Sequence, residues 1–541
     1  MKKRVAALFS CLVAFGVVGC GKSAEPEKQR VVNLMEINEI SSMDSANAFD
    51  GGSFIAITQV MEGLYNLDEE DQPIPGVAAA EPEVSQDGLT YTVKLRENAK
   101  WSDGSTVVAD DFVFAWQKVV DPEFGSNSSI LISGIIKNAE AIIQGQKKIS
   151  ELGVKAVDDH TLEIQLEQPI PYFQSVLTFP TLFPQKREYV ERAGKKYAQD
   201  SEHLLYNGPF ELAEWDGTGQ TWQYLKNLEY WEPTTTNVDK IAVQVVKETD
   251  LGVKLYENGE LDRAVLSGEF SQQYQQDSAY TSSLDSWVHY LSLNQQKAGK
   301  ETIFLNGNIR KALSLAIDKE HIVTNILKNG SQVLNGYIPA EFVRNPETQL
   351  DFRQENGELM VRDQVKARAD WQLGMEELGL KEVEVSLVGS DQDENKGISE
   401  YLQFVLEEQF PGLTVKIQLM PEKNLLAAKE QGDYDILLTR SGPDYQDPLT
   451  FLDSYRTGNW GNSSGYSNQS YDQQLSEADA LTTQVAKRWQ AMLKAEQILV
   501  NDGAMVPLYQ SANTALQRES LTGLVHHLFG PPNSYRKLQL N

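Results

Sequence analysis

Cysteine is almost absent from this chain of 541 residues. The sequence holds two, Cys11 and Cys20, and both lie within the first twenty residues. Two cysteines so close to the start cannot build a disulfide framework or a cysteine-based zinc site in the rest of the chain. A cross-linked secreted mini-domain and a zinc-stabilised fold are therefore excluded.

Catalytic and metal-binding motifs are missing as well. The sequence contains no HExxH and no P-loop. The adjacent pair His526 and His527 has no cysteine or third histidine nearby. The acidic run 391–395 begins like a calcium loop, but Lys396 replaces the required glycine and Leu402 replaces the bidentate glutamate. We predict a polar loop at 391–395, no metal, no cofactor and no enzymatic activity.

Positive charge is scarce, because 48 Lys and Arg oppose 77 Asp and Glu and give a formal net charge of -29. So acidic a surface repels nucleic acid and anionic lipid, and it is typical of a soluble protein outside the cell. No run of 18 apolar residues follows the N-terminal segment. Nucleic acid is excluded as a partner.

The N-terminal segment has the pattern of an export signal. A basic start precedes an apolar run at 5–18 that is too short to span a bilayer stably. The letters VVGC that end at Cys20 resemble a bacterial lipobox. We predict a signal peptide at 1–19, lipidation of Cys20 and a flexible tether at 20–30, which would hold the protein at the cell membrane on its extracellular or periplasmic face. The alternative is an ordinary secretory signal cleaved nearby.

Strand and helix patterns alternate along the rest of the chain, which predicts an α/β fold of two or three domains. Ser53 is expected to N-cap the first helix. The segment 382–419 reads as strand, helix and strand, a crossover that implies a parallel sheet. Other strands are expected at 31–35, 89–95, 240–246 and 288–293, and other helices at 110–120, 309–318 and 485–500.

One stretch, 432–451, has the pattern of a ligand-binding strand end. Its apolar run 436–438 is typical of a buried parallel strand, and Asp444 and Tyr445 follow just past the strand. Clefts of open α/β domains lie outside the carboxyl ends of strands, so Asp444 is a candidate ligand anchor. The alternative is a solvated loop aspartate. We expect Trp287 and its neighbours 289 and 290 to be core, with a side-chain pocket as the alternative.

Nine ordered motifs resemble the solute-binding proteins of bacterial oligopeptide ABC importers, the family-5 extracellular solute-binding proteins. The resemblance covers residue 31 to the end. The motifs are EGL at 62–64, LRENAKWSDG at 95–104, ADDFV at 109–113 with Trp116, NGPF at 207–210, YW at 230–231, GELD at 259–262, NIRKAL at 308–313, AID at 316–318 and GPDYQDP at 442–448.

The resemblance implies a two-lobed fold of the periplasmic-binding-protein type II, with an extra subdomain in lobe one. The implied division places lobe one (domain I) at 31–61, 186–287 and 508–541, the extra subdomain (domain II) at 62–185, and lobe two (domain III) at 288–507. A peptide would lie buried between the lobes, paired like a β-strand, and hinge closure would signal the transporter.

The resemblance also implies site residues. Asp444 corresponds to the aspartate that holds the peptide ammonium, and Tyr445 follows it. Ser441, Gly442 and Pro443 correspond to the strand beside the ligand in lobe two. The opposing strand of lobe one corresponds to Phe49, Asp50 and Gly51.

The chain departs from that pattern at one place, where relatives carry Gly-Trp and this sequence has Arg440-Ser441. The missing tryptophan removes a large apolar pocket wall. Three alternatives are open for Arg440. It fills the place of the tryptophan, it pairs with an acidic side chain of the ligand, or it faces solvent or a structural partner. Residues for the peptide carboxyl end are not identified.

We therefore predict a lipid-anchored, monomeric receptor that captures oligopeptides and delivers them to an ABC permease and its ATPase. A receptor for one signalling peptide such as a pheromone is the alternative. A nickel- or haem-binding member of the same fold is a further one, and a secreted hydrolase would require a catalytic cluster that the sequence lacks.

Overall fold

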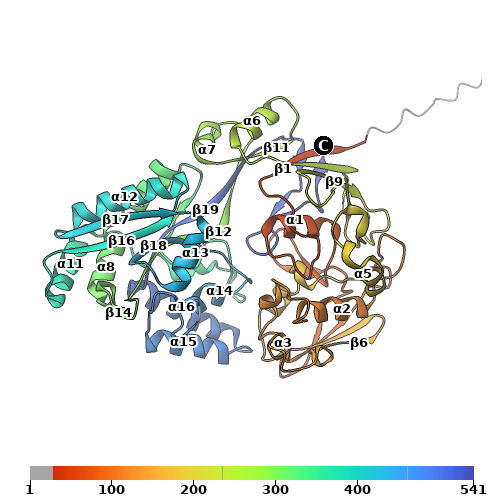
Figure 1. Cartoon of the computed structure of the whole chain (residues 1–541), viewed down its shortest axis with the longest axis horizontal. Helices are drawn as coiled ribbons and strands as arrows, with labels where there is room; N and C mark the ends of the chain where they lie inside the picture. The colour runs from red at the N-terminus through yellow and green to blue at the C-terminus, as the bar shows by residue number, and fades with distance from the viewer. Residues whose placement is uncertain (1–28, 234–235, 460) are drawn as a thin grey trace, which may run out of the picture.

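The computed structural model describes residues 29–541 except 234, 235 and 460. The predicted signal peptide, Cys20 and all but the last two residues of the tether lie outside the described residues. The chain forms two halves joined by long strands (Figure 1). We call lobe one the half that contains α1 and lobe two the half that contains α12.

Lobe one is built on a four-stranded sheet of order β1-β10-β9-β8. Parallel pairing joins β1 (Val31–Glu36) to β10 (Lys240–Val245), and antiparallel pairing adds β9 (Thr221–Lys226) and β8 (Phe210–Ala213). The helix α1 (Gly51–Val60) buries Ile57 and Val60 against this sheet. C-terminal residues such as Tyr535 and Leu538 complete the same core, so both ends of the described chain meet in lobe one.

A second sheet, of order β4-β5-β7-β6, has its own core inside the same half. Its strands are β4 (Glu83–Val84), β5 (Thr90–Lys94), β6 (Val154–Asp158) and β7 (Thr161–Gln165). The helix α2 (Ala109–Val119) packs Phe112 and Trp116 into that core, and Asp110 and Asp111 occupy its first turn as predicted. Carboxylates there favour the positive end of the helix dipole.

Lobe two confirms the predicted crossover. The strand β16 (Val383–Ser390), the helix α12 (Asp393–Gln409) and the strand β17 (Leu413–Met420) follow one another, and the two strands pair in parallel. The next strand, β18 (Ile436–Ser441), pairs in parallel with β16. The run 391–395, expected to be a loop, instead enters the first turn of α12, with Gln392 as N-cap residue.

Two long strands connect the halves. β12 (Tyr280–Leu293) and β19 (Met505–Gln517) pair antiparallel inside the sheet of order β11-β19-β12-β18-β16-β17, where β11 is Arg263–Leu266. Their register shifts between Leu284 and Val288, a bulge that bends the ladder where it crosses between the lobes. The helices α6 (Thr249–Glu257) and α7 (Gly268–Tyr274) lie at the top of Figure 1, beside this crossing.

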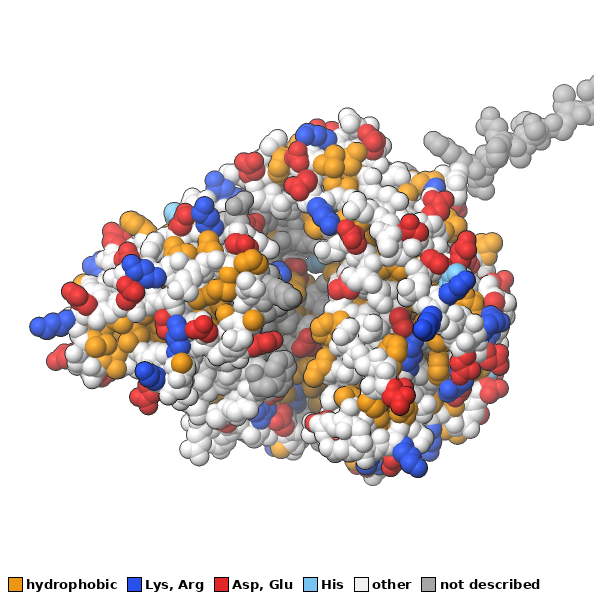
Figure 2. Space-filling model, viewed as in Figure 1, with side chains coloured by type: hydrophobic (Ala, Val, Ile, Leu, Met, Phe, Trp, Pro, Cys, Tyr) orange, Lys and Arg blue, Asp and Glu red, His pale blue; other side chains and the backbone are white. Residues whose placement is uncertain are grey.

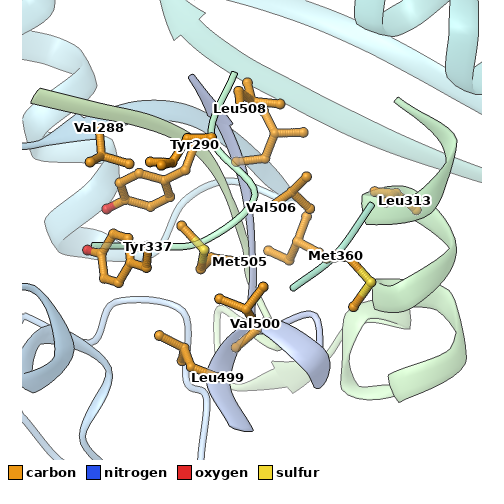
Figure 3. Close-up of a cluster of buried hydrophobic side chains, with 14 of the residues drawn as sticks. Val288, Tyr290, Leu313, Tyr337, Met360, Leu499, Val500, Met505, Val506 and Leu508 are labelled. Carbon is orange, nitrogen blue, oxygen red and sulfur yellow. The ribbon is translucent and has the colours of Figure 1, made fainter. Parts of the chain in front are cut away.

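The core of lobe two lies directly under β12 and β19. Figure 3 shows Tyr290 next to Tyr337, with Met505, Val506 and Leu508 beside them. The Tyr290 and Tyr337 rings meet edge to face, with centroids 5.5 Å apart. The helices α8 (Gly307–Ala316), α11 (Gln364–Leu378) and α16 (Val485–Asn501) cover this core. Strand β12 is therefore packed against a well-filled apolar core.

One helix start differs from prediction. Asp50, and not Ser53, caps α1, because the Asp50 carboxylate accepts from the Ser53 N–H at 2.9 Å and from the Ser53 hydroxyl at 2.8 Å. Within the described ranges, no helix is both long and apolar enough to cross a bilayer.

Candidate functional site

The end of β18 is a free strand edge. β18 pairs with β12 over its whole length, from Ile436 opposite Leu293 to Ser441 opposite Val288. On its other side it pairs with β16 only at Ile436 and Leu437. Residues 438–441 therefore have no strand neighbour on that side in the described part of the chain. An unpaired edge presents backbone N–H and C=O groups to which another strand can bind.

Cavities flank this edge on both faces of the sheet. Successive side chains of a strand point to opposite faces. Ser441 and Tyr290, which lie on the same face of the paired strands β18 and β12, line a cavity of ≈ 550 Å³. Arg440 and its partner His289 line a second cavity, of ≈ 220 Å³, on the other face. We call these the large and the small cavity. Figure 2 shows the surface hollowed between the two halves.

Asp444 lies on the wall of the large cavity, three residues past the end of β18. Its N–H donates to the Thr450 hydroxyl at 2.8 Å, which fixes the loop. Its carboxylate is accessible to solvent in the cavity and has no hydrogen bond or ion pair with any described residue. The surrounding protein removes water from one side of the carboxyl group and raises the pKa of Asp444 above 3.8. The site therefore holds a carboxylate that lacks a cation.

A buried ion pair holds the loop that carries Asp444. Arg488 of α16 donates to both carboxylate oxygens of Asp447, at 2.6 and 2.9 Å, and both side chains are buried. Asp447 also accepts from the Leu449 N–H at 3.0 Å. Sequence reasoning missed this pair because the two residues are 41 positions apart and no local pattern links them.

Tyr445 contacts the other half of the molecule. Its ring stacks on Tyr172 of the second sheet's domain, with centroids 4.0 Å apart and ring planes 4° from parallel. It also lines the large cavity. Tyr172 precedes α4 (Phe173–Val176) and was not identified from sequence. This stack joins the two halves beside Asp444.

Trp287 lies on the strand next to β18 and contacts Arg440 and Gly442. It was expected to be core, but its side chain is 40% exposed. The guanidinium carbon of Arg440 lies 4.7 Å from the centroid of its ring. A Cβ on Gly442 would lie 3.0 Å from that ring, so any larger residue there would have to displace the ring slightly. Tyr290 is buried in the core as expected and also lines the large cavity, whereas His289 lines the small cavity.

The lobe-one residues expected to face the ligand do not form a strand. Asp50 is the N-cap of α1, Gly51 is the first residue of that helix, and Phe49 precedes them with 55% of its side chain exposed. The strand prediction was wrong because the Asp50 carboxylate is engaged by Ser53, which starts the helix at this point. Neither cavity is lined by these residues.

The histidine pair has a structural position. His527 is buried, and its Nδ1 lies 2.8 Å from a carboxylate oxygen of Asp71. His526 lies in β21 (Val525–His526) beside Asn533. In the part of the chain that the structure describes, no three His, Cys, Asp or Glu side chains are grouped to hold a metal ion.

Two lobes joined by crossing strands, with a hollow at the free end of β18, define the class of two-lobed solute-binding proteins. The chain matches the family model for bacterial extracellular solute-binding proteins, family 5 (middle), over residues 72–463. The protein belongs to this family.

Relatives cover nearly the whole chain. The dipeptide-binding protein DppE of Bacillus subtilis is 32% identical over 96% of this chain and 95% of its own length. The structure of Listeria monocytogenes OppA bound to peptide is 40% identical, with a TM-score of 0.77, and covers 95% of this chain and 100% of the other. The structure of the pheromone receptor PrgZ is 36% identical, with a TM-score of 0.77 and coverage of 95% and 100%.

Proposed function

We propose that this protein captures oligopeptides in the cleft between its lobes and delivers them to an ABC importer. One observation carries the proposal: an unpartnered carboxylate, Asp444, stands at the end of a free strand edge with a cavity on each face. A free peptide offers an ammonium for the carboxylate, a backbone for the edge and alternating side chains for the two cavities. The dipeptide-binding and peptide-bound relatives support this choice of ligand.

The geometry sets the direction of the peptide. An ammonium at Asp444 places the first peptide residue near Gly442, and the following residues run toward Ile436. The peptide is then antiparallel to β18 and uses the backbone of Arg440, Ser441 and Gly442. Main-chain bonds do not depend on side-chain identity, so many sequences bind while the cavities adjust the preference.

Further features belong to the same proposal. We place the boundaries of domains I, II and III where the sequence predicts them, and the three largest apolar clusters support a division into three parts. The segment 49–51 approaches the ligand from lobe one on closure, and Pro443 and Tyr445 complete the lobe-two wall. The protein is a non-catalytic monomer anchored through a lipid on Cys20, on the extracellular or periplasmic face of the membrane.

The direct test is to identify what the purified protein carries. We expect mass spectrometry of ligand released on denaturation to find peptides with free N-termini. Calorimetry with one such peptide and its N-acetylated form should then show at least about tenfold weaker binding of the acetylated form, because Asp444 is left without its cation. Equal affinity for the two forms would contradict the assignment of Asp444.

Peptide affinity should fall in acid. The ligand requires the ionised carboxylate, and burial raises the pKa of Asp444 in the free protein above 3.8. Protonation of Asp444 therefore competes with binding as the pH decreases through that raised value, and binding there releases a proton. At high pH the affinity falls again as the peptide ammonium loses its proton, near about 7.7–8.0 in free peptides. Titration calorimetry across this pH range measures the fall in affinity in acid and the fall at high pH. N-acetylation of the peptide should abolish the pH dependence that comes from the ammonium.

A receptor for one signalling peptide is the second candidate, since the pheromone receptor PrgZ is a near structural relative. Calorimetry with a peptide mixture and with single defined peptides separates the two: a nutritional receptor binds most members with similar affinity, whereas a signalling receptor binds one. A nickel- or haem-binding role would be favoured if Asp444→Ala left peptide affinity unchanged.

A further inference from the structure

Arg440 is a cation whose electrostatic neighbour is the carboxyl group of Asp285. Its side chain is exposed, and in the described part of the chain its guanidinium makes no hydrogen bond and no ion pair. Its recorded contact is the face of Trp287, 4.7 Å away. Such stacking orients the guanidinium plane but satisfies none of its five N–H donors. The Arg440 guanidinium is therefore a planar set of donors that is held in place and free to bind. A carboxylate fits it, because a carboxylate accepts two parallel hydrogen bonds from a guanidinium.

Among the described residues that line the small cavity, Arg440 is the one Lys or Arg side chain. Its cross-strand partner His289 is neutral, because burial and the nearby Arg440 charge lower the pKa of the imidazole to about 3. The His289 ring nitrogens are engaged by the Tyr509 and Ser511 hydroxyls, at 2.9 and 3.0 Å. Glu394 also lines the cavity, and burial raises the pKa of its carboxyl above 4.5.

The position of Arg440 fixes which part of a peptide it meets. Asp444 and Arg440 are four residues apart, and a strand rises about 3.3 Å per residue. A peptide whose ammonium is at Asp444 and which lies antiparallel to β18 therefore brings its third or fourth residue to Arg440.

We propose that Arg440, oriented by Trp287, selects peptides that carry a carboxylate at the third or fourth residue. This inference rests on the proposed peptide-binding function and names the ligand class of that site. The carboxylate has two sources. It is the C-terminal carboxylate of a tripeptide or tetrapeptide, or the side chain of Asp or Glu at that position in a longer peptide.

The test uses calorimetry on the full-length protein with two pairs of probes. The first pair is tetra-alanine (and tri-alanine) as free acid and as C-terminal amide. The second is a hexapeptide amide, otherwise alanine, with Glu or Gln at the third or fourth residue. We expect the wild type to prefer the carboxylate member of at least one pair by about tenfold or more. The pair that shows the preference identifies the source.

Three variants complete the test. R440M keeps the apolar stem and should lose the preference while still binding the amide probes, which shows that it is folded. R440K keeps the charge but not the paired donors and should be intermediate. R344M, an exposed arginine of lobe two that lines neither cavity, should match the wild type.

Two results would overturn the inference: no carboxylate preference in either pair, or the same preference in R440M as in the wild type. If peptides still bind through their free ammonium in that case, the proposed function stands and only the role of Arg440 falls. If no peptide binds the wild type, both fall together.

Discussion

Asp444→Asn should weaken the binding of a free-amine oligopeptide by about 2–5 kcal/mol, which is roughly thirtyfold or more. The substitution keeps the shape of the side chain and removes the charge that meets the ammonium. The carboxylate has no protein cation to replace the ligand among the described residues, so the effect falls on binding and not on an internal ion pair. Calorimetry with one peptide and its acetylated form measures it, and the variant should no longer distinguish the two.

The same variant should be at least as stable as the wild type without peptide. Burial raises the pKa of Asp444 in the folded state above that in the unfolded state, so the folded state binds more protons in that range. The free energy of unfolding then decreases as the pH rises from about 3.9 through the raised pKa of Asp444. The full destabilisation by the ionised Asp444 carboxylate is present at neutral pH. Asparagine carries no charge and avoids that cost, which thermal unfolding of the peptide-free protein can measure.

A matched control is available in the same lobe. Asp433 has 76% of its side chain exposed, and its nearest recorded cation is Lys297 at 3.9 Å. Asp433→Asn should change neither peptide affinity nor the response to acetylation. If Asp444→Asn behaved like this control, the ammonium would bind elsewhere.

Asp447→Ala should have the largest effect on stability, a loss of about 3–5 kcal/mol in the free energy of unfolding of lobe two. The alanine leaves the Arg488 guanidinium buried without its carboxylate and frees the Leu449 N–H. Denaturant unfolding monitored by tryptophan fluorescence measures the loss. Peptide affinity should fall with it, because the same loop carries Asp444.

The double variant Asp447→Leu with Arg488→Met tests the reason for that loss. Replacing both charges by apolar side chains removes the unpaired cation, so much of the stability should return. The affinity for peptide should return less completely, since the hydrogen bond that shapes the loop is still missing. A cost below about 1 kcal/mol for the single Asp447→Ala change would show that the pair does not hold the loop.

Local patterns predicted the elements of the fold well. The apolar run at 436–438, the amphipathic segment of α2 and the crossover through α12 each have their cause in neighbouring residues. The motifs then predicted the two-lobed fold, which the family match confirms. The start of α1 was missed because Asp50 competes with Ser53 for the cap, and Gly51 enters the helix.

The site was less predictable, since its walls come from distant segments. Asp444 follows a strand within a few residues, so its position at the cleft could be inferred. Three residues reach the same place from other segments: Arg488 from α16, Tyr172 from the start of α4, and Trp287 from the neighbouring strand β12. Their side chains carry no periodic signal of this role, and Trp287 reads as an ordinary core residue until the bulge in β12 turns it outward.

The stacked rings of Tyr172 and Tyr445 have a consequence for the empty receptor. They belong to opposite halves, so the proposed hinge opening would separate them. An aromatic pair contributes about 0.5–1.5 kcal/mol beyond the area that it buries. That energy shifts the ratio of shut to open molecules by roughly two- to tenfold. In the proposed mechanism, the peptide therefore stabilises a shut state that the contact between the two rings already favours. Replacing Tyr172 with leucine should leave the peptide-free cleft open for a larger fraction of the time.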